Sequence, residues 1–272
     1  GILILIIILA VVEGSVRIFE IFNPPCEFIN SPVFENEIFL SVSLICLDST
    51  NLLYDQETVL RLVPNQHYTT ININSDGFRG PDITINKPDE TYRIMLLGGS
   101  SAFGMGSTSD ETTISGFLQK KFEDNNINNI QIINAGVGGT ISYEEKYYAE
   151  NFLMRFNPDL FLIYDGGNDV RYRIQSPNDL INKSNFDKGF KFGDYPFYRT
   201  PFVVTKLINQ YAIHDNIPKE PEKITEDVKN TIVNNWKTTW SEFCINNNKK
   251  GIDTVIFLQP IAGTSNRILS AE

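Results

Sequence analysis

From residue 92 onward, short apolar runs alternate with amphipathic helical patterns, and this alternation restricts the chain to a small set of folds. Apolar runs bounded by glycine or polar turns are typical of buried strands. Such runs occupy residues 93–97, 130–133, 160–164 and 253–258. Helical patterns with apolar residues at spacings of three and four lie between them. Strands joined through helices form a doubly wound parallel sheet with right-handed crossovers, so the sequence predicts an α/β fold.

Three of these four predicted strands run directly into glycine-rich polar turns. The turns read GGSS at 98–101, NAGVGGT at 134–140 and DGGND at 165–169. In parallel sheets, ligands bind at the carboxyl ends of the strands. Glycines let backbone amides approach a ligand, and a serine hydroxyl beside amide donors and an asparagine side chain is what acyl transfer requires. Each turn alone is typical of an ordinary loop, but their joint occurrence predicts an acyl-transfer site.

In this order and spacing, the three turns resemble the sequence blocks of the SGNH hydrolases, the GDSL-like family of esterases and lipases. The stretch GGSSAFG matches the first block and implies that Ser100 is the nucleophile. The stretch NAGVGGT matches the second block and implies that Gly139 binds the oxyanion. The stretch GGND matches the third and implies that the side chain of Asn168 is an oxyanion donor, together with the backbone amide of Ser100.

The resemblance covers Tyr92 to about Ile261 and implies a three-layer α/β/α sandwich with a mostly parallel, flavodoxin-like sheet. It implies a serine esterase that hydrolyses ester-linked acyl groups without a cofactor. Similar membrane-anchored proteins suggest O-acyl groups on envelope or secreted glycans as the substrate, with lipid esters second. The alternative is a non-catalytic relative that keeps the turns to bind a glycan.

Two departures from the family pattern concern the nucleophile and its base. The residue before the serine is Gly99, where the family usually has an aspartate. The family's D-x-x-H block, which supplies acid and base, does not follow the final strand, and we expect it beyond Glu272 in a longer reading frame, since the chain also begins without Met. Neither His67, which precedes the sheet, nor His214, which Asp215 follows in the wrong order, is expected to replace that base.

The chain begins with an apolar run, Gly1–Val12, that carries no charge. A membrane span needs roughly 20 residues, so we interpret the run as the end of a longer signal anchor, with the rest of the chain on the non-cytoplasmic side. A buried helix or strand and a cleaved signal peptide are the alternatives. The upstream stretch NSDGFRG also resembles the membrane-anchored members, although Asp76 and Arg79 are equally well read as ordinary turn and surface residues.

These patterns divide the chain into a membrane segment at 1–20, a membrane-proximal extension at 21–89 and a hydrolase domain at 90–272. In an exported protein, Cys26 and Cys46 could pair. Cys244 lies in a helical pattern and is expected to be a buried thiol.

The acidic charge balance of the chain disfavours nucleic acid as a binding partner. The formal net charge of -10, from 33 acidic and 23 basic residues, leaves no extended positive surface for nucleic acid. The glycine turns lack a G-K-[ST] ending, which disfavours a nucleotide site, and no cluster with ligand spacing indicates a metal. The expected partners are a small-molecule or glycan ester and, through the N-terminal segment, a membrane.

Overall fold

The computed structural model describes residues 1–22, 34, 38–55, 59–172 and 225–260. They fall into two compact units, and Leu53 ends the N-terminal part of the first while Tyr54 begins the second. Cys26 and His214 lie outside the described residues, as does the possible pairing of Cys26 with Cys46. Cys46 is buried, and Cys244, expected to be buried, is a partly buried free thiol.

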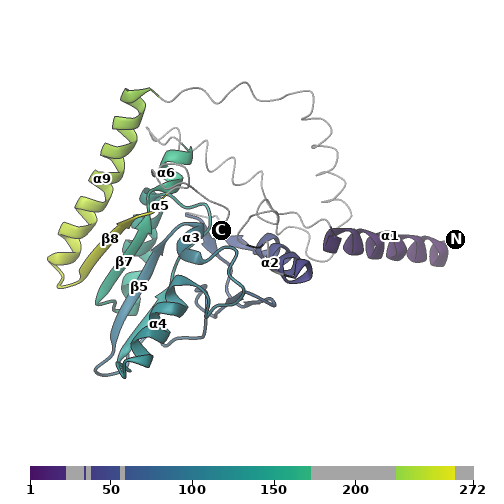
Figure 1. Ribbon diagram of the computed structural model, residues 1–272, viewed down its shortest axis with the longest axis horizontal. Coiled ribbons are helices and arrows are strands. Elements are labelled where there is room, and N and C mark those ends of the chain that lie inside the picture. The colour runs from purple at the N-terminus through teal and green to yellow at the C-terminus, as the bar shows by residue number, and fades with distance from the viewer. Residues whose placement is uncertain (23–33, 35–37, 56–58, 173–224, 261–272) are drawn as a thin grey trace. The chain divides into compact units, whose positions relative to one another are not determined.

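A four-stranded parallel sheet forms the centre of the second unit (Figure 1). Its strands are β5 (Tyr92–Gly98), β6 (Ile130–Asn134), β7 (Leu160–Asp165) and β8 (Asp253–Leu258), in the spatial order β6-β5-β7-β8. All three strand pairs are parallel. Gly98 at the end of β5 lies opposite Tyr164 in β7, so the ends of the two central strands are level. The predicted α/β fold with a doubly wound parallel sheet is confirmed.

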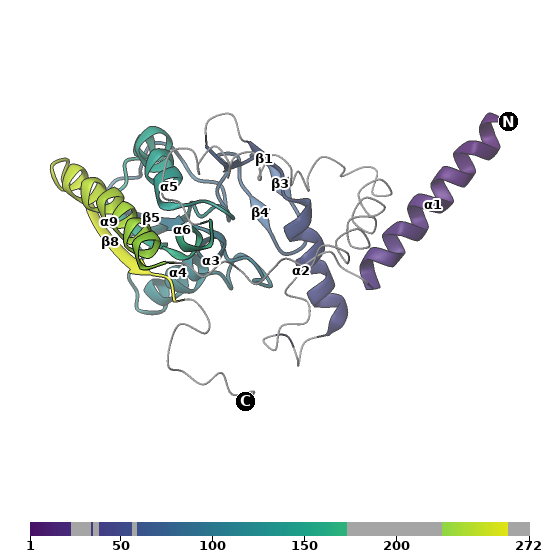
Figure 2. The same ribbon diagram turned by 90° about the horizontal axis from the view of Figure 1, so that it is seen from above.

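Helices cover both faces of the sheet (Figure 2). Helix α4 (Ile114–Asp124) connects β5 to β6 and lies on one face. Helices α5 (Ser142–Tyr148) and α9 (Glu226–Asn248) lie on the other face. The side changes because β6 lies on one side of β5, whereas β7 and β8 lie on the opposite side, and crossovers between parallel strands are right-handed. The chain after α5 continues as a π-helical turn, Ala149–Leu153, and a 3-10 turn, Met154–Phe156. Together these layers make the expected α/β/α sandwich.

The core lies between the sheet and the helices α5 and α9. Phe161 of β7 packs edge-on against Phe243 of α9 with ring centroids 5.1 Å apart, and Trp240 also packs edge-on against Phe243, at 5.6 Å. Aromatic side chains of this size bury large apolar areas, so α9 is fixed firmly to β7. Further buried members of this cluster are Met95, Leu97, Ile133, Ile163, Tyr148, Leu153 and Phe156.

Two short hairpins precede the parallel sheet. Strands β1 (Tyr54–Asp55) and β2 (Arg61–Leu62) pair antiparallel, as do β3 (Gln66–His67) and β4 (Asn72–Ile73). An antiparallel bridge then joins Arg79 to Asn134 at the end of β6. The compact unit that contains the sheet therefore begins at Tyr54, upstream of the domain start that the composition predicts at residue 90.

The N-terminal unit contains α1 (Ile2–Phe22) and α2 (Phe39–Asn51). Of the described helices, α1 is the one that is long and apolar enough, over Ile2–Glu20, to be a membrane anchor or a signal sequence. It extends well past the uncharged run Gly1–Val12. Glu13 and Arg17 form an ion pair of 2.9 Å one turn apart, which lets both charges continue the same helix.

Candidate active site

A sharp turn between β5 and the short helix α3 (Ser100–Phe103) carries the predicted nucleophile. We call residues 98–104 the nucleophile turn. Gly98 has a φ of +146°, and a Cβ added to it would lie 2.2 Å from the carbonyl oxygen of Tyr164. Any side chain there would force the strands apart, so the turn requires glycine. It places Ser100, half-buried, at the first position of α3, directly beyond the carboxyl end of β5.

The side chain of Asn168 lies against this turn. Asn168 is in α6 (Gly167–Tyr172), and its Nδ2 donates a hydrogen bond of 2.7 Å to the carbonyl oxygen of Thr140. A Cβ built on Gly99 would be 2.6 Å from that Nδ2, so the amide group occupies the space where a side chain at 99 would begin. An amide nitrogen carries two hydrogens, so the second can be offered to a ligand beside Ser100.

The loop that carries Gly139 is attached to the same strand end. The amide of Val137 donates to the carbonyl of Gly98 at 3.0 Å, and Thr140 closes the loop by donating its Oγ1 to the Val137 carbonyl at 2.8 Å. Gly139 has a φ of +86°, a conformation that glycine adopts without strain. The three predicted site residues are thus brought to one edge of the sheet by contacts among their own loops.

The two neighbouring serines differ in their partners. Gln259, directly after β8, donates from Nε2 to the Ser101 Oγ at 2.8 Å, and its backbone amide donates to the Asp165 carbonyl at 2.8 Å. Within the described chain, no hydrogen bond involves the Ser100 hydroxyl. Ser101 is therefore held in place, whereas Ser100 is available for chemistry. Gln259 was missed from the sequence, although its position after the fourth strand is the signal that could have found it.

The described residues contain one of the two histidines, and it is not at this site. His67 lies exposed on β3, and its Nδ1 is hydrogen-bonded to Oδ1 of Asn72. Within the described ranges, no group of three or more His, Cys, Asp or Glu side chains is placed to hold a metal ion.

Three buried carboxyl groups lie beneath the site. Asp169 accepts hydrogen bonds from the amide and the hydroxyl of Ser142, which joins α6 to the start of α5. Asp165 accepts from the indole nitrogens of Trp236 at 3.0 Å and Trp240 at 3.1 Å. Glu145 accepts from Thr140 Oγ1 at 2.9 Å through one oxygen, while its buried Oε2 has no hydrogen-bond partner. Sequence reasoning assigned these groups no role, because only the fold buries them.

Burial raises the pKa of two of these carboxyl groups. Loss of solvent raises the pKa of Asp165 to about 7, and the nearby Asp169 charge adds to the effect. Loss of solvent also raises the pKa of Glu145 well above its usual value, with Asp165 and Asp169 contributing. An ionised carboxylate in this cluster is thus unfavourable.

We expect Asp165→Asn to flatten the pH dependence of folding stability. An unfolded aspartate ionises near pH 3.9, whereas folded Asp165 stays protonated up to about pH 7. Between these values the unfolded chain binds fewer protons, so the free energy of unfolding falls as pH rises and levels off above about pH 7. Asparagine does not titrate and keeps an acceptor oxygen for the two indoles.

Urea unfolding of the full-length protein at a series of pH values between 4 and 7.5 (roughly the interval set by the two pKa values) measures this slope. The control is Asp89→Asn, at an exposed loop position, which should keep the wild-type slope. If Asp165→Asn and wild type lose stability equally over this range, Asp165 is ionised in the folded state and the account of the cluster is wrong.

Comparisons with known proteins come from solved structures. No protein-family model matches the sequence, and no curated protein matches it either. The esterase AlinE4, an SGNH-hydrolase family member, is 18% identical, with 57% of this chain and 97% of that chain covered at a TM-score of 0.29. The acetyl xylan esterase AlAXEase is 17% identical, with 60% and 76% covered at a TM-score of 0.31.

A family 3 carbohydrate esterase of Clostridium thermocellum is 15% identical, with 61% of this chain and 78% of that chain covered at a TM-score of 0.29. The solved structures to which this chain is similar thus include SGNH-type and carbohydrate esterases.

Proposed function

We propose that this chain is an SGNH-type serine esterase with Ser100 as its nucleophile. The observation that carries the proposal is the convergence of three turns. The Asn168 amide lies over Gly99, one residue from Ser100, and the loop of Gly139 is hydrogen-bonded to Gly98 through Val137. A free serine hydroxyl beside amide donors is the arrangement that acyl transfer needs.

The proposed reaction proceeds through an acyl-enzyme. Ser100 Oγ attacks the ester carbonyl, and the negative charge that develops on the carbonyl oxygen is stabilised by the amides of Ser100 and Gly139 and by Asn168 Nδ2. The alcohol leaves, and water then releases the acid and regenerates the serine. The proton of Ser100 passes to a general base that the described residues do not supply, so activity is to be measured on the full-length protein.

For the substrate, we propose ester-linked acyl groups on envelope or secreted glycans. The support is α1, whose length and apolar composition suit a membrane anchor or a signal sequence, together with the serine esterase chemistry proposed above. The test is acetate release by the full-length protein from O-acetylated glycans, alongside hydrolysis of p-nitrophenyl acetate. Turnover of both supports the proposal. Glycan binding without turnover of any ester would instead identify a non-catalytic relative.

For the location, we propose a membrane-anchored protein whose catalytic domain lies outside the cytoplasm. All of the side chains that would face lipid in the first part of α1, from Ile2 to Leu9, are exposed. Full-length protein should therefore remain in the membrane fraction after carbonate extraction, and external protease should reach the catalytic domain in intact cells. Recovery of a soluble form cleaved after α1 would show a signal peptide instead.

A further inference from the structure

Arg79, which the sequence allows as an ordinary surface residue, is buried. Its guanidinium side chain has 0% exposed area, and the residue as a whole is 4% exposed. A buried charge is unfavourable unless it is paired and hydrogen-bonded, so its contacts reveal what keeps it there. The surface interpretation of Arg79 is therefore wrong.

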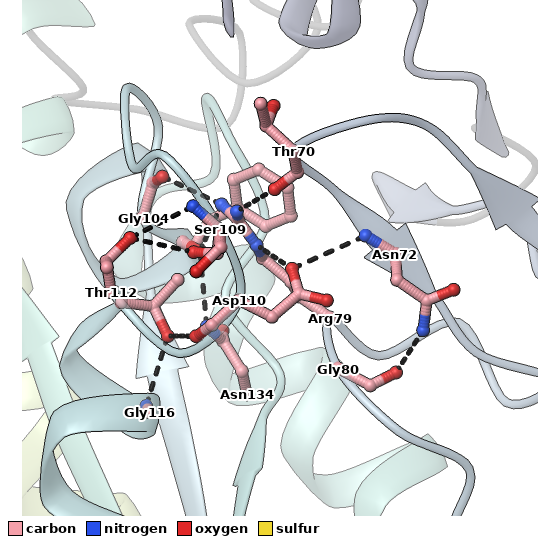
Figure 3. A network of polar contacts seen from close by, with 12 residues as sticks. Thr70, Asn72, Arg79, Gly80, Gly104, Ser109, Asp110, Thr112, Gly116 and Asn134 are labelled. Atoms are coloured by element: carbon pink, nitrogen blue, oxygen red, sulfur yellow. Dashed lines mark hydrogen bonds and ion pairs between the residues drawn. The ribbon is translucent and has the colours of Figure 1, made fainter.

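The guanidinium of Arg79 binds the end of the nucleophile turn (Figure 3). Its Nη1 donates to the carbonyl oxygens of Gly104 at 2.8 Å and Phe103 at 3.3 Å. These are the last residue of α3 and the residue after it, and carbonyls at a helix end lack partners within the helix. The same guanidinium lies 4.9 Å from the centre of the Phe103 ring. Arg79 thus supplies donors that a four-residue helix cannot supply for itself.

The other donors of Arg79 bind the loop between β3 and β4 and the carboxylate of Asp110 (Figure 3). Its Nη2 donates to the carbonyl of Thr70 at 2.8 Å, and its Nε donates to Oδ1 of Asp110 at 2.8 Å. Asp110 also accepts from the backbone amide of Asn72 at 3.4 Å. The charge is therefore neutralised on one side while the opposite side of the guanidinium holds α3.

Asn134, at the end of β6, also binds the end of α3. Its Nδ2 donates to the carbonyl oxygen of Phe103 at 3.2 Å, and its own carbonyl oxygen accepts from the backbone amide of Arg79 at 3.1 Å. A Cβ added to Gly136 would lie 2.4 Å from the Phe103 nitrogen, so the turn has no free space on this side. Ser100 is one helical turn from these contacts, and fixing the end of so short a helix fixes its beginning.

We propose that Arg79 is a positioning residue that sets the location of the Ser100 hydroxyl through the far end of α3. The inference rests on the proposed function and adds a residue that does not touch the substrate. Lysine keeps the charge, but a single ammonium group cannot reach the acceptors on Gly104, Thr70 and Asp110 at once. A misplacement of about 1 Å at a reacting group costs roughly 100-fold in rate.

The chain offers a matched control in Arg93. Arg93 is fully buried, and its guanidinium donates to the backbone carbonyls of Phe156 at 2.6 Å and Thr84 at 3.0 Å. It also donates to the side chain of Gln131 at 2.7 Å. Arg93 lies near the beginning of β5, however, at the opposite end of that strand from Ser100. Arg93→Lys therefore removes a similar set of buried hydrogen bonds but leaves the contacts of the nucleophile turn unchanged.

The test compares Arg79→Lys with Arg93→Lys in the full-length protein, using p-nitrophenyl acetate and thermal unfolding. Both variants should lose thermal stability. Arg79→Lys should reduce kcat per folded molecule by about 10- to 100-fold with KM within about 2-fold of wild type, whereas Arg93→Lys should keep the wild-type kcat. The rate at which a fluorophosphonate labels Ser100 should fall in parallel for Arg79→Lys.

Wild-type kcat in Arg79→Lys, or an equal loss in Arg93→Lys, would overturn the inference, since burial alone would then account for Arg79. A wild-type protein without esterase activity or Ser100 labelling would overturn the proposed function, and this inference with it. If Arg79→Lys does not fold, Asp110→Ala serves instead. This substitution is milder, because the Asp110 side chain is 21% exposed and its ion pair is with the Nε of Arg79, so the Nη donors of Arg79 keep their acceptors. It should lower kcat several-fold at unchanged KM, and an unchanged kcat would count against the inference.

Discussion

Replacing Ser100 with alanine is expected to lower the kcat of the full-length protein for p-nitrophenyl acetate by about 10⁴-fold or more, with the fold intact. Alanine removes the oxygen that forms the acyl bond, and the neighbouring hydroxyl of Ser101 is held by Gln259. Ser100 is half-buried at the start of α3 and makes no side-chain hydrogen bond within the described chain, so the substitution costs little stability.

The matched control for this substitution is the neighbouring serine. Ser101→Ala removes the hydroxyl that accepts from Gln259 Nε2 at 2.8 Å, and it should change kcat by no more than about 10-fold, the order of one hydrogen bond. If Ser101→Ala abolishes turnover while Ser100→Ala preserves it, the assignment of the nucleophile is reversed.

Replacing Asn168 with alanine is expected to lower kcat by about 10²- to 10³-fold while KM changes little, as the loss of one oxyanion donor does elsewhere. The amide of Asn168 is aimed by its hydrogen bond to the Thr140 carbonyl, and its contact with Gly99 places it beside the nucleophile. Asn168→Asp should be at least as damaging, because a carboxylate there would oppose the negative charge that develops on the substrate.

The control for Asn168 is another asparagine with the same type of local contact. Asn125 donates from Nδ2 to the carbonyl of Lys121 at 2.7 Å, but it lies exposed at the end of α4. Asn125→Ala should leave kcat at the wild-type value. Equal kcat values for Asn168→Ala and wild type would remove Asn168 from the oxyanion site.

The strands could be predicted closely because each is an apolar run that ends in glycine or polar residues. The run at 160–164, for example, becomes β7, Leu160–Asp165. Helix starts were harder to predict. Acidic residues often mark the first turn of a helix, and Asp110 and Glu111 offer such a signal, but α4 begins at Ile114 with Thr113 as its N-cap. The carboxylate of Asp110 is instead paired with Arg79, a contact that no local pattern reveals.

The predicted site residues share one property: each lies in a glycine-rich turn that defines its own local geometry. Ser100, Gly139 and Asn168 could therefore be proposed as site residues from short motifs. Arg79 and Gln259 could not, because their partners at the site lie 24 to 158 residues away in the chain. Their roles exist only once β5, β6 and β8 have brought those segments together.

The same limit applies at the N-terminus. An uncharged run of 12 residues was too short to span a membrane, yet α1 extends from Ile2 to Phe22 and includes the ion pair of Glu13 and Arg17.

The assignment of Ser100 as the nucleophile can be tested by labelling the full-length protein with a fluorophosphonate and locating the modified residue by mass spectrometry. A nucleophilic serine attacks the phosphorus, displaces fluoride and remains covalently bound. We expect a single modification, on Ser100, that an excess of p-nitrophenyl acetate slows and that Ser100→Ala abolishes. Modification of Ser101 or another residue, or none at all in a protein that still hydrolyses the ester, would contradict the account.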